Sequence, residues 1–179
     1  AYTKDGNQPT GIGGDDKAGV FICLQLLERF NVIKGFFPVA EETGCHGSRG
    51  AKEEFFNNVG YAIQFDSTEN DTMSLSLMGT QLFEQDSEFF NKTKGLILEH
   101  GFTEWRHHPY TDTMVLKERF NFSCLNFAAG YYNYHSNNEY VIVEDVFNST
   151  LLGEGVIKKL GNKFYEFKST KKDSFGWFD

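Results

Sequence analysis

A chain of 179 residues is long enough for one domain with a sizeable core, and 40% hydrophobic against 23% charged residues indicates a globular, soluble protein. The net charge of −8 and the pI near 5.1 argue against a nucleic-acid binder, which needs a basic face. No run approaches the roughly 18 apolar residues of a membrane span, and no signal peptide opens the printed chain. The three cysteines have no CxxC spacing, and Cys23 and Cys124 lie in apolar runs, which predicts buried free thiols and favours a reducing, cytoplasmic setting.

The first half of the chain alternates apolar segments with acidic ends. Residues 17–30 (KAGVFICLQLLERF) are apolar on nearly every side, which predicts a buried helix with an acidic pair at its amino end. Residues 36–42 (FFPVAEE) and 59–66 (VGYAIQFD) predict short buried strands. Residues 48–56 (SRGAKEEFF), between them, predict a helix.

The second half continues this alternation with longer helices. Residues 79–101 predict a long amphipathic helix that ends at a glycine, and 137–161 predict a second long helix. The remaining segments predict an edge strand, a short helix, a buried strand and an alternating strand or tail, at 102–108, 111–119, 120–129 and 163–168. Strands that alternate with helices of about ten or more residues indicate an α/β fold, with a mixed, largely parallel central sheet flanked by helices. No repeat, low-complexity tract or linker divides the chain, so residues 1–179 are expected to form one domain.

Carboxylates recur at one topological place along this pattern. Asp15 and Asp16 lie at a turn into a helix. Glu41 and Glu42 follow one predicted strand, and Asp66 follows another. In open α/β sheets, ligands bind outside the carboxyl ends of the strands, so these acids are expected to converge. Several unpaired carboxylates packed together repel one another and take up protons unless a metal ion neutralises them.

His135 completes a set of metal-ligating side chains. It lies in the polar segment 128–140 (AAGYYNYHSNNEY), after an apolar strand and before the last long helix. A neutral imidazole together with carboxylates suits zinc, and also cobalt or manganese. Any one such residue is more often a cap, a turn residue or part of a solvated face. The order of the whole set, with every member at the end of an element, favours a metal site.

Residues 10–19 (TGIGGDDKAG) share their glycines with phosphate-binding turns but not their charge. Such a turn presents backbone N–H groups to an anion, usually with a lysine and without acids between them. Here two adjacent aspartates occupy that place, and the spacing is neither GxGxxG nor GxxxxGK[ST]. The turn is therefore predicted to face a cation.

Four motifs in this order resemble those of the co-catalytic zinc exopeptidases and deacylases, which include peptidase T, glutamate carboxypeptidases, aminoacylase and succinyl-diaminopimelate desuccinylases. The Asp-x-Lys-x-Gly motif of that family, after a glycine-rich turn, resembles residues 14–19 (GDDKAG), and its Glu-Glu-x-Gly-x-x-Gly resembles 41–47 (EETGCHG). Its third acid is matched by Asp66 in AIQFDS, and its late His, in a His-Ser context, by His135. The resemblance covers roughly residues 11–160 and implies a three-layer sandwich with helices on both faces of the sheet.

This resemblance implies a hydrolase of peptide or N-acyl amide bonds that uses two zinc ions, or cobalt or manganese in their place. Asp15 would bridge the two ions, and in this family the peptide bond after that residue is often cis. Glu42 and His135 would complete the ligands of one ion, and Asp66 would serve the other. Glu41 would be the general base, which takes a proton from the activated water and passes it to the leaving amine. The implied substrates are peptides cleaved near a chain end and small acylated amino acids.

Not every part of the chain follows that family. Its amino-terminal His-x-Asp motif, which supplies the first His ligand and an Asp that orients the catalytic Glu, has no counterpart, because no His precedes His46. Many members insert a lid or dimerisation domain before the late His, but residues 67–134 have the pattern of ordinary helices and strands, so no lid is expected. Residues 111–113 (TDT) resemble a substrate-side Ser/Thr-Asp pair of the wider clan, although a helix N-cap explains Asp112 more simply.

These departures leave alternatives open. We expect that the chain lacks the first part of its domain, and a natural single-metal or metal-free relative is the alternative. A partner chain could supply the missing His, so a homo-oligomer also stays open. For function, the rival to a metal-dependent hydrolase is a non-catalytic metal- or ligand-binding relative of the same fold. A plain α/β domain with surface acids is a further rival, which predicts that the acids and His135 do not converge.

Overall fold

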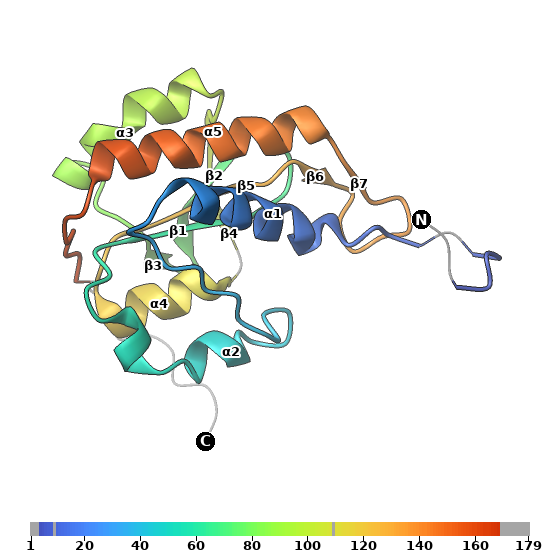
Figure 1. Ribbon diagram of the computed structural model, residues 1–179, viewed down its shortest axis with the longest axis horizontal. Coiled ribbons are helices and arrows are strands. Elements are labelled where there is room, and N and C mark those ends of the chain that lie inside the picture. Colours follow the sequence, from blue (N-terminus) through green and yellow to red (C-terminus); the bar gives the residue numbers. More distant parts are fainter. Residues whose placement is uncertain (1–3, 9, 109, 169–179) are drawn as a thin grey trace.

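A mixed β-sheet lies between two layers of helices (Figure 1). The computed structural model describes residues 4–8, 10–108 and 110–168. Helices cover both faces of the sheet: α1 (Gly14–Arg29), α3 (Glu88–Glu99) and α5 (Val143–Leu160) on one, and α2 (His46–Arg49) and α4 (Asp112–Phe120) on the other. The α/β class predicted from the alternation of strands and helices is confirmed.

The sheet has the strand order β1–β5–β2–β3, and β4 also pairs with β2. Its strands are β1 (Ala62–Ser67), β2 (Thr72–Leu77), β3 (Thr80–Gln81), β4 (Glu104–His108) and β5 (Cys124–Ala128). β1 runs parallel to β5, with Ala62 opposite Cys124, and β2 runs parallel to β4. β2 is antiparallel to both β5 and β3. The sheet is mixed, as predicted, but less parallel than expected, because β2 reverses the strand direction between the parallel pairs.

The parallel pair β1 and β5 positions the loops that carry the candidate site. The carboxyl ends of both strands lie on the same side of the sheet, and Asp66 is the penultimate residue of β1. The chain after β5 enters a two-stranded antiparallel ribbon, β6 (Tyr131–Tyr132) and β7 (Tyr140–Val141), and the loop of this ribbon carries His135. The amino end of α1 packs against the same ribbon.

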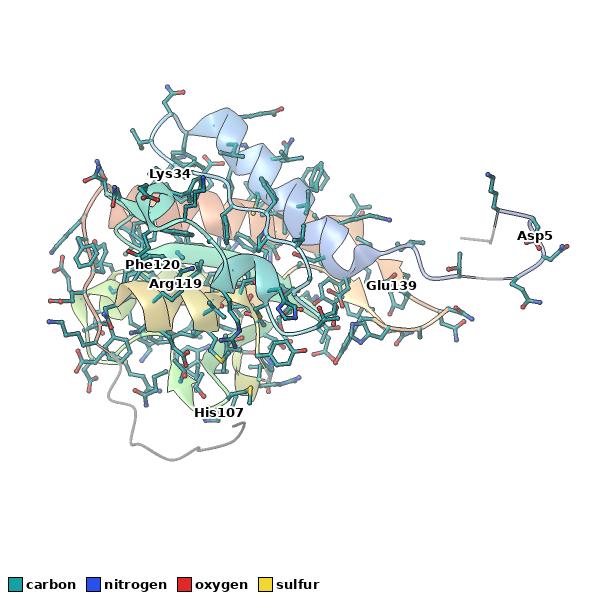
Figure 2. The ribbon with its side chains drawn as sticks, turned by 90° about the horizontal axis from the view of Figure 1, so that it is seen from below. Asp5, Lys34, His107, Arg119, Phe120 and Glu139 are labelled. Atoms are coloured by element: carbon teal, nitrogen blue, oxygen red, sulfur yellow. The ribbon has the colours of Figure 1, made fainter. Side chains whose placement is uncertain are left out.

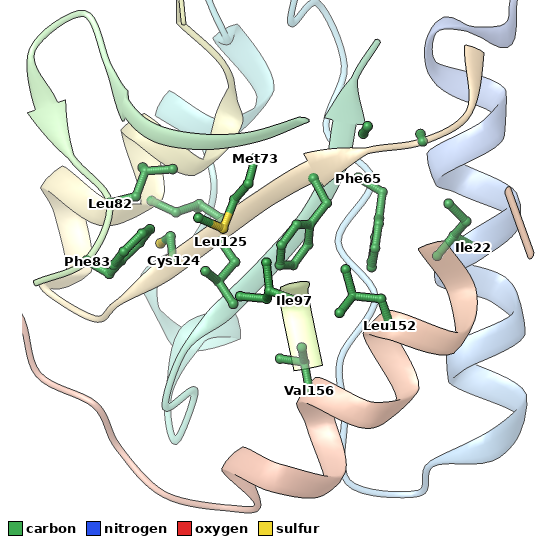
Figure 3. Packing of buried hydrophobic residues seen from close by; sticks show 14 of the residues in the cluster. Ile22, Phe65, Met73, Leu82, Phe83, Ile97, Cys124, Leu125, Leu152 and Val156 are labelled. Carbon is green, nitrogen blue, oxygen red and sulfur yellow. The ribbon is translucent and has the colours of Figure 1, made fainter. Parts of the chain in front are cut away.

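The core lies between the sheet and the helices α1 and α5 (Figure 3). Phe65 of β1 and Phe127 of β5 are buried with their ring centroids 5.9 Å apart. Ile22 of α1 and Leu152 of α5 are fully buried in the same cluster. Each such side chain contributes about 1.5–3 kcal/mol through burial. Gly153 lets α5 approach closely, because a Cβ there would lie only 2.8 Å from the Phe65 ring.

Several predicted elements are confirmed. The segments 17–30, 59–66, 102–108, 111–119 and 120–129 correspond to α1, β1, β4, α4 and β5. β5 is buried throughout, as expected, whereas β1 is buried only at Phe65 and Ser67. Among the described strands β4 pairs only with β2, which makes it an edge strand. Residues 163–168 form a tail that bridges Phe122 through Glu166 and bonds through Tyr165 to the backbone of Ser123 and Gly60.

Both long helices begin later than predicted. The segment 79–101 forms β3 and a turn before α3, which starts after Ser87, whose Oγ accepts a hydrogen bond from the Phe90 N–H at 3.3 Å. The segment 137–161 forms β7 before α5 starts at Val143. In both cases a short strand finds a partner in the sheet or the ribbon, and this pairing overrides the helical pattern.

β2 has no counterpart among the predicted elements, although its residues (TMSLSL) alternate between polar and apolar as in a half-buried strand. The serines are buried in the folded chain and bond to histidines of the neighbouring strand. Ser74 Oγ lies 2.6 Å from His108 Nδ1, and Ser76 Oγ lies 2.6 Å from His107 Nδ1. These cross-strand hydrogen bonds satisfy hydroxyl groups that burial would otherwise leave unpaired.

Two predictions in residues 36–56 are wrong. Residues 36–42 form no strand, and the side chains of Phe37 and Val39 are 47% and 73% exposed. A strand needs a neighbour for its backbone groups, and no described segment pairs with this one. The predicted helix 48–56 is instead two short pieces, α2 and the 3-10 helix Glu53–Phe56, separated by Gly50.

The structure describes all three cysteines and allows a search of the helices for membrane spans. All three cysteines are free; Cys45 and Cys124 are buried, and Cys23 is partly buried. Within the described residues, no helix combines the length and the apolar character needed to cross a membrane.

Candidate metal centre

Asp15, Glu42 and His135 meet at the carboxyl end of the parallel strands. His135 Nε2 lies 3.0 Å from Asp15 Oδ2 and 3.0 Å from Glu42 Oε1. One ligand atom from each of the three side chains lies within 4.8 Å of the other two. Ligand atoms about 2 Å from a common zinc ion would be separated by distances of this order. Three of the four predicted ligands therefore lie together, whereas Asp66 is not part of this group.

The glycine-rich turn presents Asp15 and turns Asp16 away. Gly13 has a φ of 68°, a left-handed conformation that glycine adopts without strain. The peptide bond between Asp15 and Asp16 is cis, as the family resemblance implies. Asp16 Oδ1 accepts the N–H of Gly19 at 3.0 Å, so this carboxylate serves the start of α1. A Cβ on Gly19 would lie 2.0 Å from the Phe65 carbonyl oxygen, so only glycine allows α1 to pack this closely on β1.

Glu41 and Glu42 lie in a tight turn before α2. The Glu41 carbonyl accepts the N–H groups of Gly44 and Cys45, both at 2.9 Å. The Tyr110 hydroxyl donates to the Glu42 carbonyl at 2.8 Å and so ties the turn to the start of α4. The backbone of this turn is therefore held from two sides, while the Glu42 side chain points to His135.

Asp66 lies beside this cluster but outside the group of three. Gln64 Nε2 donates to Asp66 Oδ2 at 2.8 Å, and the Asp66 backbone N–H donates to Asn126 Oδ1 at 3.1 Å. Burial and the negative charge of Asp15 raise the pKa of the Asp66 carboxyl to about 7. The charge of Asp15 thus acts on the Asp66 carboxyl, although Asp66 is outside the group of three.

The cluster carries more negative than positive charge. Burial, followed by the charges of Asp66 and Asp112, raises the pKa of the Glu41 carboxyl to about 8. Burial and then Glu42 raise the pKa of Asp15 above its usual value. The hydrogen bond to Glu42 raises the pKa of His135, whose side chain is 57% exposed. Carboxyls that take up protons in this way are those that a cation would return to the charged form.

Two residues near the site differ from the sequence predictions: Asp112 has another role than the one predicted, and Gln64 was not predicted. Asp112 is the first helical residue of α4 and not its N-cap, a position taken by Thr111. The Asp112 carboxylate is buried and accepts a hydrogen bond from Ser48 Oγ, behind the Glu41 turn. Gln64 also positions the site, and its place two residues before Asp66 on one strand face is a signal that the sequence offers.

Glu139 is the third supporting residue, and no sequence motif singles it out. Its carboxylate accepts the N–H of Gly13 at 2.6 Å and that of Asp15 at 3.0 Å. Although burial opposes ionisation, the N–H groups of Asp15 and Gly13 hold the pKa of Glu139 below its usual value. The backbone donors that a phosphate-binding turn would offer are thus occupied by a carboxylate of the chain itself, which agrees with the prediction that this turn does not bind phosphate.

Comparison with known proteins adds no assignment. No protein-family model matches this chain, and no curated protein shows detectable sequence similarity to it. The functional interpretation therefore depends on the motifs and on the geometry of the site.

Proposed function

We propose that this domain is a metal-dependent hydrolase of peptide or N-acyl amide bonds, related in fold and mechanism to the co-catalytic zinc exopeptidases and deacylases. The observation that carries the proposal is the meeting of Asp15, Glu42 and His135, which are far apart in the sequence. Their meeting gives a mixed carboxylate and imidazole donor set of the kind that zinc prefers. The helices on both faces of the mixed sheet are compatible with the three-layer sandwich of that family.

Asp15, Glu42 and His135 would hold one zinc ion, or cobalt or manganese in its place. Asp15 and Asp66 would share a second ion, although the described residues form no second group of three ligands that could hold it. Bound zinc would polarise the scissile carbonyl and lower the pKa of water. That the missing histidine lies on a preceding segment or on a second copy of the chain stays a prediction.

Glu41 is the group placed to move the proton. It precedes a proposed ligand in the same turn, and its partly buried carboxyl is subject to the charges of Asp66 and Asp112. A carboxylate there would accept a proton from the attacking water and return it to the leaving amine. Its raised pKa makes it a stronger base than an ordinary glutamate whenever a neighbouring cation keeps it deprotonated.

The substitution Glu41→Gln tests the proposal, with Glu54→Gln as a matched control on an exposed position. Metal content is measured by mass spectrometry, and hydrolysis is measured on aminoacyl nitroanilides and N-acetyl amino acids. We expect Glu41→Gln to retain its metal while kcat/KM falls by at least about 100-fold, the usual contribution of a general base. Unchanged hydrolysis in Glu41→Gln would contradict the role of Glu41.

The second candidate is a non-catalytic metal- or ligand-binding domain. The observation that favours it is the incomplete second site, since only one full set of three ligands is present among the described residues. A wild-type protein that binds one zinc ion tightly and hydrolyses no substrate of either class would support this alternative over the enzyme.

A further inference from the structure

Glu139 connects the two loops that supply the candidate metal ligands. It lies four residues after His135 in the loop between β6 and β7 and reaches across to the turn before Asp15 (Figure 2). Its Oε2 accepts the N–H of Gly13 at 2.6 Å, and its Oε1 accepts the N–H of Asp15 at 3.0 Å. The residue is only 9% exposed, so both bonds lie in a largely dry environment.

The glycines of the turn wrap around this carboxylate. A Cβ on Gly11 would lie 2.9 Å from Glu139 Oε2 and 2.8 Å from the Ser136 carbonyl oxygen. A Cβ on Gly14 would lie 2.7 Å from Val141 and 3.0 Å from Tyr131. Successive N–H groups around an anion form a nest of the kind that elsewhere binds phosphate. In this chain the nest is closed around an internal anion.

We infer that Glu139 is a positioning residue of the metal centre: its carboxylate fills the anion nest of residues 11–15 and thereby holds Asp15 against His135. One loop then provides His135 as a ligand and Glu139 as the group that places another ligand. The same contact excludes external anions from the turn. The effect on metal binding rests on the proposed function, whereas the filling of the nest does not.

A purely structural role for Glu139 makes a different prediction. A carboxylate that only caps a turn stabilises the fold, and its loss would lower the melting temperature without changing the coordination of a bound ion. A positioning residue also changes how the ligands surround the ion. The visible spectrum of bound Co²⁺ reports this coordination directly and does not depend on catalysis.

The experiment compares Glu139→Ala, Glu139→Gln and the wild type, with Glu144→Gln as a control that removes one exposed acid from the first turn of α5. Each metal-free protein is titrated with Co²⁺, and the affinity and the spectrum are recorded. The titrations and thermal melts are repeated in sodium formate and in sodium chloride of equal ionic strength, so that screening is matched. Formate is a carboxylate small enough to replace the missing side chain in Glu139→Ala.

We expect the Co²⁺ affinity of Glu139→Ala to fall by at least about tenfold, as for other groups that orient metal ligands, with a changed spectrum. Formate should restore most of the affinity in this variant and raise its melting temperature, with no such effect on the wild type. Glu139→Gln should also bind Co²⁺ more weakly but resist formate rescue, because its amide fills the nest while offering one acceptor instead of two.

Wild-type affinity and spectrum in either Glu139 variant would overturn the inference. A folded Glu139→Ala that formate neither stabilises nor rescues would also overturn it. If Glu139→Ala does not fold, the Co²⁺ affinity of Glu139→Gln decides whether Glu139 positions the metal ligands. If the wild type binds no Co²⁺, the proposed function fails, and the formate-dependent melting temperature of Glu139→Ala still decides whether Glu139 fills the nest.

Discussion

The two ends of the parallel pair β1 and β5 have opposite chemical character. At the carboxyl end, Asp66 and the loops around it gather acids and His135. At the amino end lies a groove of about 610 Å³, the phenylalanine groove, walled by Phe56, Phe120, Phe122 and Phe164. Figure 2 shows Phe120 and Glu139, one from each end, well separated in the molecule.

One end of the two strands contributes mainly to stability, and the other end carries the candidate metal ligands. At the phenylalanine groove the rings of Phe56 and Phe120 stack at 4.3 Å, and Phe122 is buried beside them. The amino end therefore contributes mainly apolar packing, with charged side chains such as Lys163 only at its rim. The carboxyl end buries carboxyls whose pKa values are raised, an arrangement that weakens the metal-free fold and suits a cation. Changes at one end should leave the other unaffected, and the following predictions test this.

The largest effect is expected at the groove. Phe122→Ala removes a buried ring and should lower the free energy of unfolding by about 3–5 kcal/mol. Zinc affinity should stay within about twofold, because distant sites act independently. Urea unfolding and competitive zinc titration measure the two quantities, and Phe164→Ala, at an exposed ring, is the milder control. A large loss of zinc affinity in the folded Phe122→Ala protein would show that the two ends are coupled.

The converse test is His135→Ala. Removal of a direct ligand should weaken zinc binding by at least about 100-fold, the upper end of the effect known for indirect partners. The free energy of unfolding of the metal-free protein should change by less than about 1 kcal/mol, because the side chain is exposed. His46→Ala, at an exposed histidine of α2, should change neither quantity. Wild-type zinc affinity in His135→Ala would remove His135 from the site.

The acids at the carboxyl end predict a pH dependence of stability. The pKa values of Glu41 and Asp66 rise from 4.5 to about 8 and from 3.8 to about 7 in the folded state. Between these limits the unfolded chain has lost protons that the folded chain retains, so raising the pH favours unfolding. The metal-free protein should melt at least about 2–4 °C lower at pH 9 than at pH 5, which corresponds to about 1 kcal/mol.

Thermal melts across this pH range check the sign of the effect. Glu41→Gln should reduce the slope, because the amide does not titrate, and saturating zinc should reduce it in the wild type as well. A melting temperature that stays level or rises from pH 5 to pH 9 in the metal-free protein would contradict the burial of these carboxyls.

The smallest effect is expected for the charged rim of the groove. Lys163 pairs with Glu88 on the surface, and exposed ion pairs contribute little. Lys163→Gln should therefore change the free energy of unfolding by less than about 1 kcal/mol and leave zinc affinity unchanged. A larger effect of Lys163→Gln than of Phe164→Ala would mean that charge, and not apolar packing, holds the amino end together.

The sequence by itself determined the α/β class, the apolar helix α1, the strands β1 and β5, and the order of the acids along the chain. These features depend on local periodicity and on turn residues, which neighbouring positions specify. The prediction that Asp15 faces a cation also came from local signals, since a second carboxylate stands where an anion would bind. Three of the four motifs contain the residues that meet, whereas the motif of Asp66 names a residue outside the group.

Only the tertiary structure decided which groups support the candidate metal ligands. The Glu139 carboxylate bonds to residues 124 and 126 positions away, and Asp112 receives its hydrogen bond from a serine 64 positions away. The segment 36–42 has a strand-like composition but pairs with no described neighbour, so it forms a turn-bearing loop. Contacts between distant segments depend on how the whole chain packs, and a hydrogen bond formed across more than a hundred residues leaves no periodic trace in the sequence.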